Sequence, residues 1–131
     1  MKYFIALVHK DNDSAFGISF PDLPSVFSAA DIEDDLTANA IEAIRLWAEE
    51  EAPPIPSSYN DLMSRDDVRA ELARGAFLTH IPFIADDTRT VRANVTFDRG
   101  MLDAIDATAK ERGLTRSAFL ASAARKEIEA A

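Results

Sequence analysis

The chain of 131 residues contains no cysteine, which excludes disulfides, thiolate-ligated metal centres and a cysteine nucleophile. It also lacks a long apolar run near its start. The run from Tyr3 to Val8 is too short for the core of a signal peptide or for a membrane span. We therefore expect a cytoplasmic protein without membrane contact, and the length suits one ordinary domain or two small ones.

Residues suited to catalysis are scarce. The two histidines, His9 and His80, fall on different expected strands and lack the spacing of paired metal ligands. A two-metal nuclease site needs carboxylates that converge from a central strand, and the first apolar strand carries none. Four aspartates are available for a metal site, Asp11, Asp13, Asp22 and Asp31, but the first two lie in a turn where aspartate is common. We expect no catalytic residue, no metal site and no cofactor.

Positive charge is also scarce, and it is divided unevenly. From Arg89 onward, eight Lys and Arg residues accompany six Asp and Glu residues, a net charge of +2. The preceding residues hold six basic and seventeen acidic side chains, a net charge of −11, and the total is −9. This asymmetry predicts two units with different partners, because acidic surface repels nucleic acid and attracts basic protein. Plain solubility is the alternative explanation for the acidic part.

The first two thirds of the chain predict a small sheet covered by a helix. Apolar, β-branched and aromatic residues indicate strands over residues 2–8, 15–20, 26–30 and 76–84. Asp31 and Asp34 mark the start of a helix whose apolar face, from Leu36 to Trp47, would lie on the sheet. Asn39 on this helix is expected to bond a neighbouring strand or turn.

A second, shorter helix is predicted before the last strand. The proline-containing residues 52–63 are expected to be a stiff connection. Ser64 to Asp67 form a capping box for a helix that ends at Gly75. Pro82 confines its part of the last strand to an edge or to the strand end. The fold class is α+β, with a β-β-β-α-(α)-β unit over residues 1–86.

An isolated polar-faced strand is predicted from Thr90 to Phe97. Its side chains alternate, with Val91, Ala93, Val95 and Phe97 on one face and Arg92, Asn94 and Thr96 on the other. A strand needs a partner for its backbone groups, and no second strand follows. The simplest partner is the same strand of a second copy, paired antiparallel across a two-fold axis.

Two short helices follow this strand. Asp98 is a candidate N-cap for the first, which ends at Gly113, and Thr115 is a candidate N-cap for the second. The order of strand, helix, glycine-containing turn and helix over residues 87–131 resembles the ribbon-helix-helix DNA-binding modules of the CopG, MetJ and Arc type.

This resemblance implies that the paired strands enter the major groove of a palindromic operator. Arg92, Asn94 and Thr96 would contact bases, since arginine can bind guanine and asparagine can bind adenine bidentately. The amides and hydroxyls of Thr115 and Ser117, at a helix N-terminus, would hold a phosphate. The alternative is a dimerisation strand with a solvated polar face.

A second resemblance concerns residues 2–51. Phe20-Pro-Asp-Leu-Pro24, the acidic helix start Asp31 to Asp35 and Asn39-Ala-Ile-Glu-Ala43 occur here in the order typical of HicB-type antitoxins. The chain departs from that pattern at Ser25, Val26 and Ala30, where the family often has Gly, Cys and Gly. The proline-rich continuation and the ribbon-helix-helix order of the C-terminal part fit the same family.

The resemblance implies a degenerate RNase H-like N-terminal domain that has lost nuclease activity. This domain would cover a small basic HicA-type toxin that cleaves RNA, while the C-terminal module forms a homodimer or higher oligomer and represses the operon. The toxin-contacting residues are not indicated by the sequence. The alternative is a stand-alone ribbon-helix-helix regulator whose acidic domain binds a small ligand or serves oligomerisation.

Overall fold

The computed structural model describes residues 2–85 and 87–130. The chain divides into two compact units, Met1–Ile84 and Ala85–Ala131. The boundary expected from the sequence, between residues 86 and 87, lies two residues further along the chain.

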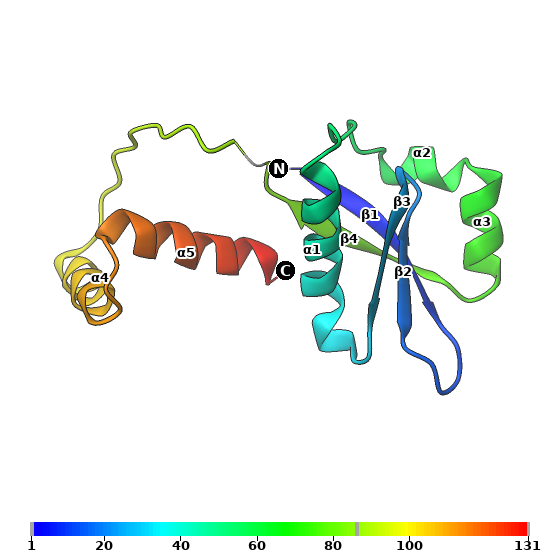
Figure 1. Ribbon diagram of the computed structural model, residues 1–131, viewed down its shortest axis with the longest axis horizontal. Helices are drawn as coiled ribbons and strands as arrows, with labels where there is room; N and C mark the ends of the chain where they lie inside the picture. The colour runs from blue at the N-terminus through cyan, green and yellow to red at the C-terminus, as the bar shows by residue number, and fades with distance from the viewer. Residues whose placement is uncertain (1, 86, 131) are drawn as a thin grey trace. The chain divides into compact units, whose positions relative to one another are not determined.

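The first unit is built on a four-stranded antiparallel sheet (Figure 1). Its strands are β1 (Lys2–Lys10), β2 (Phe16–Phe20), β3 (Leu23–Ala30) and β4 (Phe77–Phe83), in the spatial order β3-β2-β1-β4. All four strands were predicted to within a few residues at each end. Pro82 is the second-last residue of β4, so its prediction for an edge strand or a strand end is confirmed.

Helices cover both faces of this sheet. A 3₁₀ turn, η1 (Glu33–Asp35), leads into α1 (Leu36–Ala48), and α2 (Tyr59–Met63) and α3 (Asp66–Ala73) precede β4. Figure 1 shows α1 on one side of the sheet and α3 on the other.

Each face of the sheet has its own apolar core. Phe4, Ala6 and Val8 of β1 pack in the larger cluster with residues of α1 such as Ile44. Ile5 and Leu7 pack in a smaller cluster with Leu62 of α2 and Val68 of α3. β1 is therefore buried on both faces, which explains why residues 4–8 are continuously apolar instead of alternating.

The start of α1 differs from the prediction. The first turn after β3 is η1, preceded by Ile32, and no side chain caps it. α1 itself follows Asp35, again without a side-chain cap. Asp31 and Asp34 therefore do not cap a helix, because the chain passes through η1 before the first turn of α1 begins.

The stiff connection predicted over residues 52–63 includes a short helix at its end, α2, which was not predicted. Ser58 begins α2, and its hydroxyl accepts a hydrogen bond from the Asp61 amide at 3.1 Å. Ser64 is the C-cap of α2 and its hydroxyl donates to the Asp61 carbonyl, so it cannot cap α3. Arg65 precedes α3 instead. The Ser-x-x-Asp pattern that begins at Ser58 was the signal for this helix.

The second unit contains α4 (Arg99–Glu111) and α5 (Arg116–Glu129). Asp98 and Thr115 cap them as predicted, because their side chains accept hydrogen bonds from the amides of Met101 and Ala118 at 2.8 Å and 3.1 Å. Gly113 follows α4 with φ of +67°, a conformation that favours glycine. Residues 90–97 carry neither helix nor strand in the single chain, and their predicted pairing requires a second copy.

Candidate functional site

The predicted DNA-contacting residues are solvent-exposed in the second unit. Arg92, Asn94 and Thr96 precede α4, and Thr115 and Ser117 lie at the start of α5. Asn94 and Ser117 line one hollow of about 360 Å³. The remaining three residues are not among those that line it.

Apolar side chains line the same hollow beside the polar Asn94, Arg116 and Ser117. Ala93, Val95, Phe97, Leu102 and Leu120 contribute to its lining. The only buried hydrophobic residues in the described part of this unit are Ile105 and Ala109, and α5 has none. Val91 remains 88% exposed and Val95 67% exposed. A unit of this size that leaves most of its apolar side chains in water needs a partner to cover them.

An ion pair joins the two helices of the second unit. The Arg116 guanidinium donates from Nε and Nη2 to the two carboxylate oxygens of Asp106, each at 2.8 Å. These hydrogen bonds lower the pKa of Asp106 and raise the pKa of Arg116. This pair was not predicted from the sequence. An arginine in the first turn of a helix, where the dipole disfavours positive charge, was the available signal.

This pair predicts an acid-dependent change in stability. The pKa of Asp106 is lower in the folded than in the unfolded state, so its stabilisation is present above the unfolded pKa of about 3.9. It is lost as the pH falls through the folded pKa. Asp106→Asn should therefore lower the melting temperature at pH 7 and have a smaller effect at pH 3, measured by thermal unfolding. Asp103→Asn on the same helix is the control, and an equal loss at both pH values for Asp106→Asn would contradict the assignment.

In the first unit, the Phe20–Pro24 segment is held by the chain that leads into α2. Both carboxylate oxygens of Asp22 accept hydrogen bonds from Ser57, one from its amide and one from its hydroxyl, each at 2.7 Å. Arg65 donates from Nη1 to the Pro21 carbonyl at 3.2 Å. Asp22 therefore has a structural role in the turn between β2 and β3.

We expect Asp22→Ala to lower the free energy of unfolding by about 1.5–3 kcal/mol, because it removes two hydrogen bonds to a charged acceptor. Chemical denaturation of the full chain measures the loss. Asp11→Ala is a suitable control, since Asp11 lies in the β1–β2 turn and hydrogen bonds there through its backbone. Equal destabilisation by the two substitutions would show that Asp22 is not a specific anchor.

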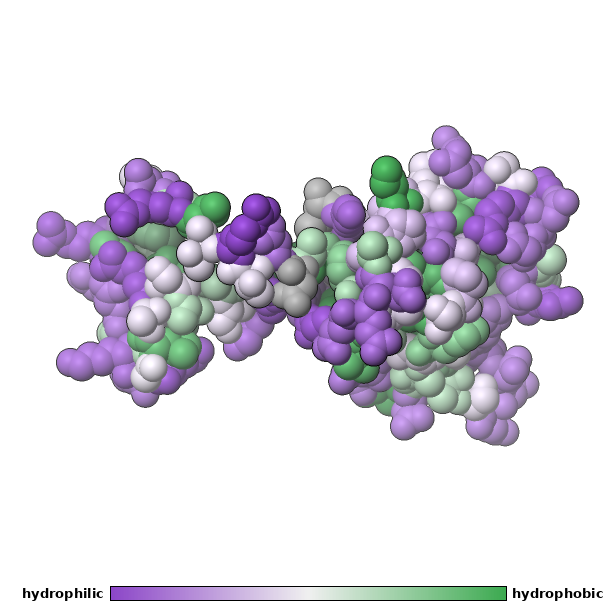
Figure 2. Space-filling view, turned by 45° about the horizontal axis from the view of Figure 1, so that its top comes forward, coloured by the Kyte–Doolittle hydropathy of each residue, from purple (hydrophilic) through white to green (hydrophobic). Residues whose placement is uncertain are grey.

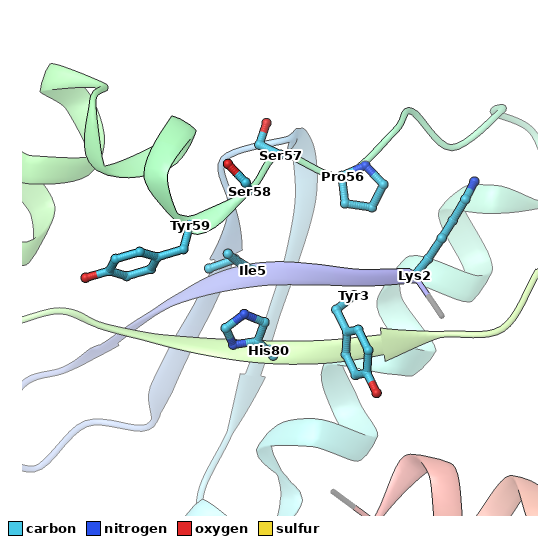
Figure 3. Close-up of a pocket in the computed structure, with 8 residues that line it drawn as sticks. All are labelled: Lys2, Tyr3, Ile5, Pro56, Ser57, Ser58, Tyr59 and His80. Atoms are coloured by element: carbon cyan, nitrogen blue, oxygen red, sulfur yellow. The ribbon is translucent and has the colours of Figure 1, made fainter.

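A second hollow, of about 310 Å³, lies beside β1 and β4 (Figure 3). Tyr3 and His80 project from these neighbouring strands, with their ring centroids 6.3 Å apart in an edge-to-face arrangement. Ser57, Ser58 and Tyr59 line it from the segment that begins α2. The structure shows no hydrogen bond between His80 and either serine within residues 2–85, so no base and nucleophile are joined here.

The other candidate ligands of a metal or catalytic site are dispersed. His9 Nδ1 lies 3.6 Å from Glu71 Oε2 at the surface. Across the described residues, no group of three or more His, Asp or Glu side chains could hold a metal ion. Asn39 donates from Nδ2 to the Ala29 carbonyl of β3 at 2.8 Å, which confirms its predicted bond to a neighbouring strand.

The acidic residues of the first unit differ in whether they form ion pairs with arginines. The acidic residues of α3 pair with arginines: Asp67 with Arg65 at 2.6 Å, Glu71 with Arg74 at 3.1 Å, and Asp66 with Arg69. The Arg65 guanidinium lowers the pKa of Asp67.

The acidic residues around α1 lack such partners. They are Asp31, Glu33, Asp34 and Asp35 before the helix and Glu49, Glu50 and Glu51 after it, all exposed. Among the residues that the structure describes, none of them takes part in an ion pair. Figure 2 shows hydrophilic side chains over much of the visible face of the first unit, which is the larger of the two. Seven of the exposed carboxylates of this unit that form no ion pair among the described residues therefore lie at the two ends of α1.

The helices described in this chain include none long and apolar enough to cross a membrane.

Comparisons with known proteins identify one family that spans both units. The family described as HicB-like antitoxin of bacterial toxin–antitoxin systems matches residues 3–124, which span both units. The crystal structure of the antitoxin HicB of Burkholderia pseudomallei is similar, with 31% sequence identity, a TM-score of 0.51, and coverage of 97% of this chain and 96% of that one. The crystal structure of antitoxin HicB3 has 28% identity and a TM-score of 0.53, with coverage of 96% and 97%.

A chain from a HicA3 and HicB3 toxin–antitoxin complex shares the fold, with a TM-score of 0.53 at 20% identity; the match covers 63% of this chain and 99% of that one. No curated protein matches. The family match over nearly the whole chain, together with the Burkholderia antitoxin, shows that the chain belongs to the HicB-like antitoxins of bacterial toxin–antitoxin systems.

Proposed function

We propose that this chain neutralises an RNA-cleaving HicA-type toxin by direct binding and represses its own operon as a dimer or higher oligomer. The observation that carries the proposal is the family match across residues 3–124, since it includes both units instead of the second alone. A stand-alone regulator would share only the DNA-binding part. Both activities belong in the cytoplasm, where the operon and the RNA are found.

The first unit is the part that we assign to the toxin. Residues 1–84 hold six basic and fifteen acidic side chains, which accounts for the whole net charge of −9. The carboxylates at the two ends of α1 form no ion pair among the described residues. An RNA-cleaving protein must attract phosphates and so carries positive charge, which makes an acidic surface complementary to it. The chain matched in the HicA3 and HicB3 complex covers 63% of this chain, close to the share that Met1–Ile84 makes up.

The same proposal includes a more specific fold for this unit, a reduced RNase H-like fold. Three antiparallel strands followed by α1 across one face are consistent with a reduced RNase H-like fold. In this proposal the unit binds its partner without cleaving RNA itself.

The second unit is the part that we assign to operator DNA. Its uncovered apolar side chains, among them Val91 and Val95, are suited to a second copy. Pairing of residues 90–97 between two copies would place Arg92, Asn94 and Thr96 on one open face of a ribbon. Thr115 and Ser117, with their amides at the start of α5, would then hold backbone phosphates.

Electrostatic attraction predicts a change in the rate of toxin binding. Neutralising Glu33, Asp34 and Asp35 together (E33Q, D34N, D35N) should slow association several-fold, about tenfold at most, in low salt and little in high salt. Stopped-flow mixing at two salt concentrations measures this. The triple variant D66N, D67N, E71Q removes the same charge from the paired acids of α3 and serves as the control. Equal rates for the two variants in low salt would show that the acids before α1 have no special part in steering.

The proposal is tested with the purified chain and the toxin encoded in its operon. We expect one equivalent of this chain to stop RNA cleavage by the toxin, and the two proteins to elute together in gel filtration. Continued cleavage with excess antitoxin would contradict it.

A further inference from the structure

Arg116 is the first residue of α5 and lies beside the residues already assigned to DNA. It lines the hollow of the second unit together with Asn94, which is assigned to a base, and Ser117, which is assigned to a phosphate. No other lysine or arginine of residues 87–130 lines this hollow. Arg116 is therefore the cation that shares one surface with both kinds of predicted DNA contact.

Arginine is an unfavourable residue at this position. The N-terminal end of a helix carries a partial positive charge, so a cation in the first turn is destabilising. The side chain of Thr115 accepts the hydrogen bond of the Ala118 amide, but the amides of Arg116 and Ser117 have no acceptor within the described residues. A bound anion would compensate the cation and accept hydrogen bonds from these amides.

The ion pair with Asp106 leaves part of the guanidinium free. Nε and Nη2 of Arg116 donate to the two carboxylate oxygens, whereas Nη1 has no acceptor among the residues that the structure describes. A guanidinium has five N–H donors, so three remain for a ligand. The Arg116 side chain is 55% exposed and that of Asp106 is 43% exposed, so a ligand has access to these donors.

Stability alone is a weak reason for this pair. Ion pairs between exposed side chains contribute little to the free energy of unfolding, and this one places its cation at the disfavoured end of a helix. Its two parallel hydrogen bonds instead fix the plane of the guanidinium. A fixed guanidinium loses less conformational entropy when it binds an anion such as a phosphate.

We propose that Arg116 binds a backbone phosphate of the operator, and that Asp106 is the positioning residue that orients it. Nη1 of Arg116 donates to the phosphate held by the amides at the start of α5. This contact extends the phosphate site assigned to Thr115 and Ser117, and it therefore rests on the proposed function. A phosphate contact carries no sequence information, so Arg116 contributes affinity without a preference for a base.

The test uses the full chain, a duplex with the promoter region of its operon, and a random duplex of equal length. Arg116→Ala should weaken binding to both duplexes by the same factor, about tenfold at low salt. It should also reduce the slope of log affinity against log salt by about two for a dimer, since each chain loses one phosphate contact. Arg116→Lys keeps the charge and should keep the slope. Fluorescence anisotropy over a salt series measures both quantities.

Two controls separate DNA contact from structural support. Asp106→Asn breaks the same ion pair but retains the cation, so the salt slope should stay that of the wild type. Arg125→Ala removes another arginine of α5, which is 50% exposed and paired with Glu129 near the other end of the helix. It should leave the slope unchanged as well.

The other outcomes contradict the contact in different ways. An unchanged slope for Arg116→Ala, with a wild-type chain that binds the promoter duplex, overturns the contact and leaves the proposed function intact. Equal decreases for Arg116→Ala and Asp106→Asn would show that the ion pair acts only by supporting α5. A loss confined to the promoter duplex would make Arg116 a base contact. A wild-type chain without affinity for the promoter duplex overturns the proposed repression and this inference together.

Discussion

Replacing Val95 and Phe97 together by aspartate is expected to leave the chain monomeric and to abolish operator binding. Both side chains line the hollow of the second unit, and in the single chain they are 67% and 38% exposed. In a dimer, each of the two copies would bury both side chains. Each large apolar side chain that is covered contributes about 1.5–3 kcal/mol to the stability of the dimer. Aspartate removes this contribution and places an unpaired charge in the interface.

Sedimentation at micromolar concentration, combined with operator binding, measures the effect of Val95→Asp with Phe97→Asp. The matched control is Asn94→Asp with Thr96→Asp, which adds the same charge to the face assigned to DNA. That control should remain dimeric and lose only DNA binding. A wild-type chain that sediments as a monomer, or a V95D/F97D variant that stays dimeric, would contradict the paired ribbon.

Arg92→Ala is expected to weaken operator binding by about 1–3 kcal/mol for each recognition contact and to relax the preference at one base pair. A guanidinium that binds guanine bidentately loses both hydrogen bonds, whereas a phosphate contact would be lost equally on any sequence. Competition between operator and random duplexes at fixed salt measures the difference.

Arg89→Ala is the control for Arg92→Ala. Arg89 lies three residues earlier and is paired with Asp87 at 2.6 Å, so its removal should reduce affinity for all duplexes by a similar, small amount. If Arg92→Ala lowers specific and random binding by the same factor, Arg92 contacts a phosphate and the base assignment is wrong.

The strands of the first unit could be predicted from the sequence because burial leaves a local pattern. The apolar run of β1 and the proline near the end of β4 each reflect an environment that the residue types themselves reveal. The bond from Asn39 to β3 was also predicted, since an asparagine side chain tends to hydrogen bond a nearby backbone group.

Helix starts and tertiary contacts were harder to predict. Two Ser-x-x-Asp patterns lie six residues apart, at Ser58 and Ser64, and only the first caps a helix. The bonds from Ser57 to Asp22 join residues 35 positions apart, which no local pattern encodes. For the ion pair between Asp106 and Arg116, the local signal at the start of α5 marks the arginine but does not identify its partner ten residues away.

The pairing of residues 90–97 stays a prediction, because its hydrogen bonds would lie between two chains. The polar and apolar residues of this segment are not separated in the single chain, where Asn94 lines the same hollow as Val95. A local alternation of side chains becomes two distinct faces only when a strand has a neighbour.

The central claim is that the chain is an antitoxin, and growth rescue tests it most directly. Cells that express the toxin of the operon from one inducible plasmid receive this chain from a second. The account predicts that induction of the chain restores growth. The V95D/F97D variant, which is deficient in operator binding, should restore growth as well, because neutralisation of the toxin does not depend on repression. Growth arrest that persists while both proteins accumulate in the cell would contradict the account.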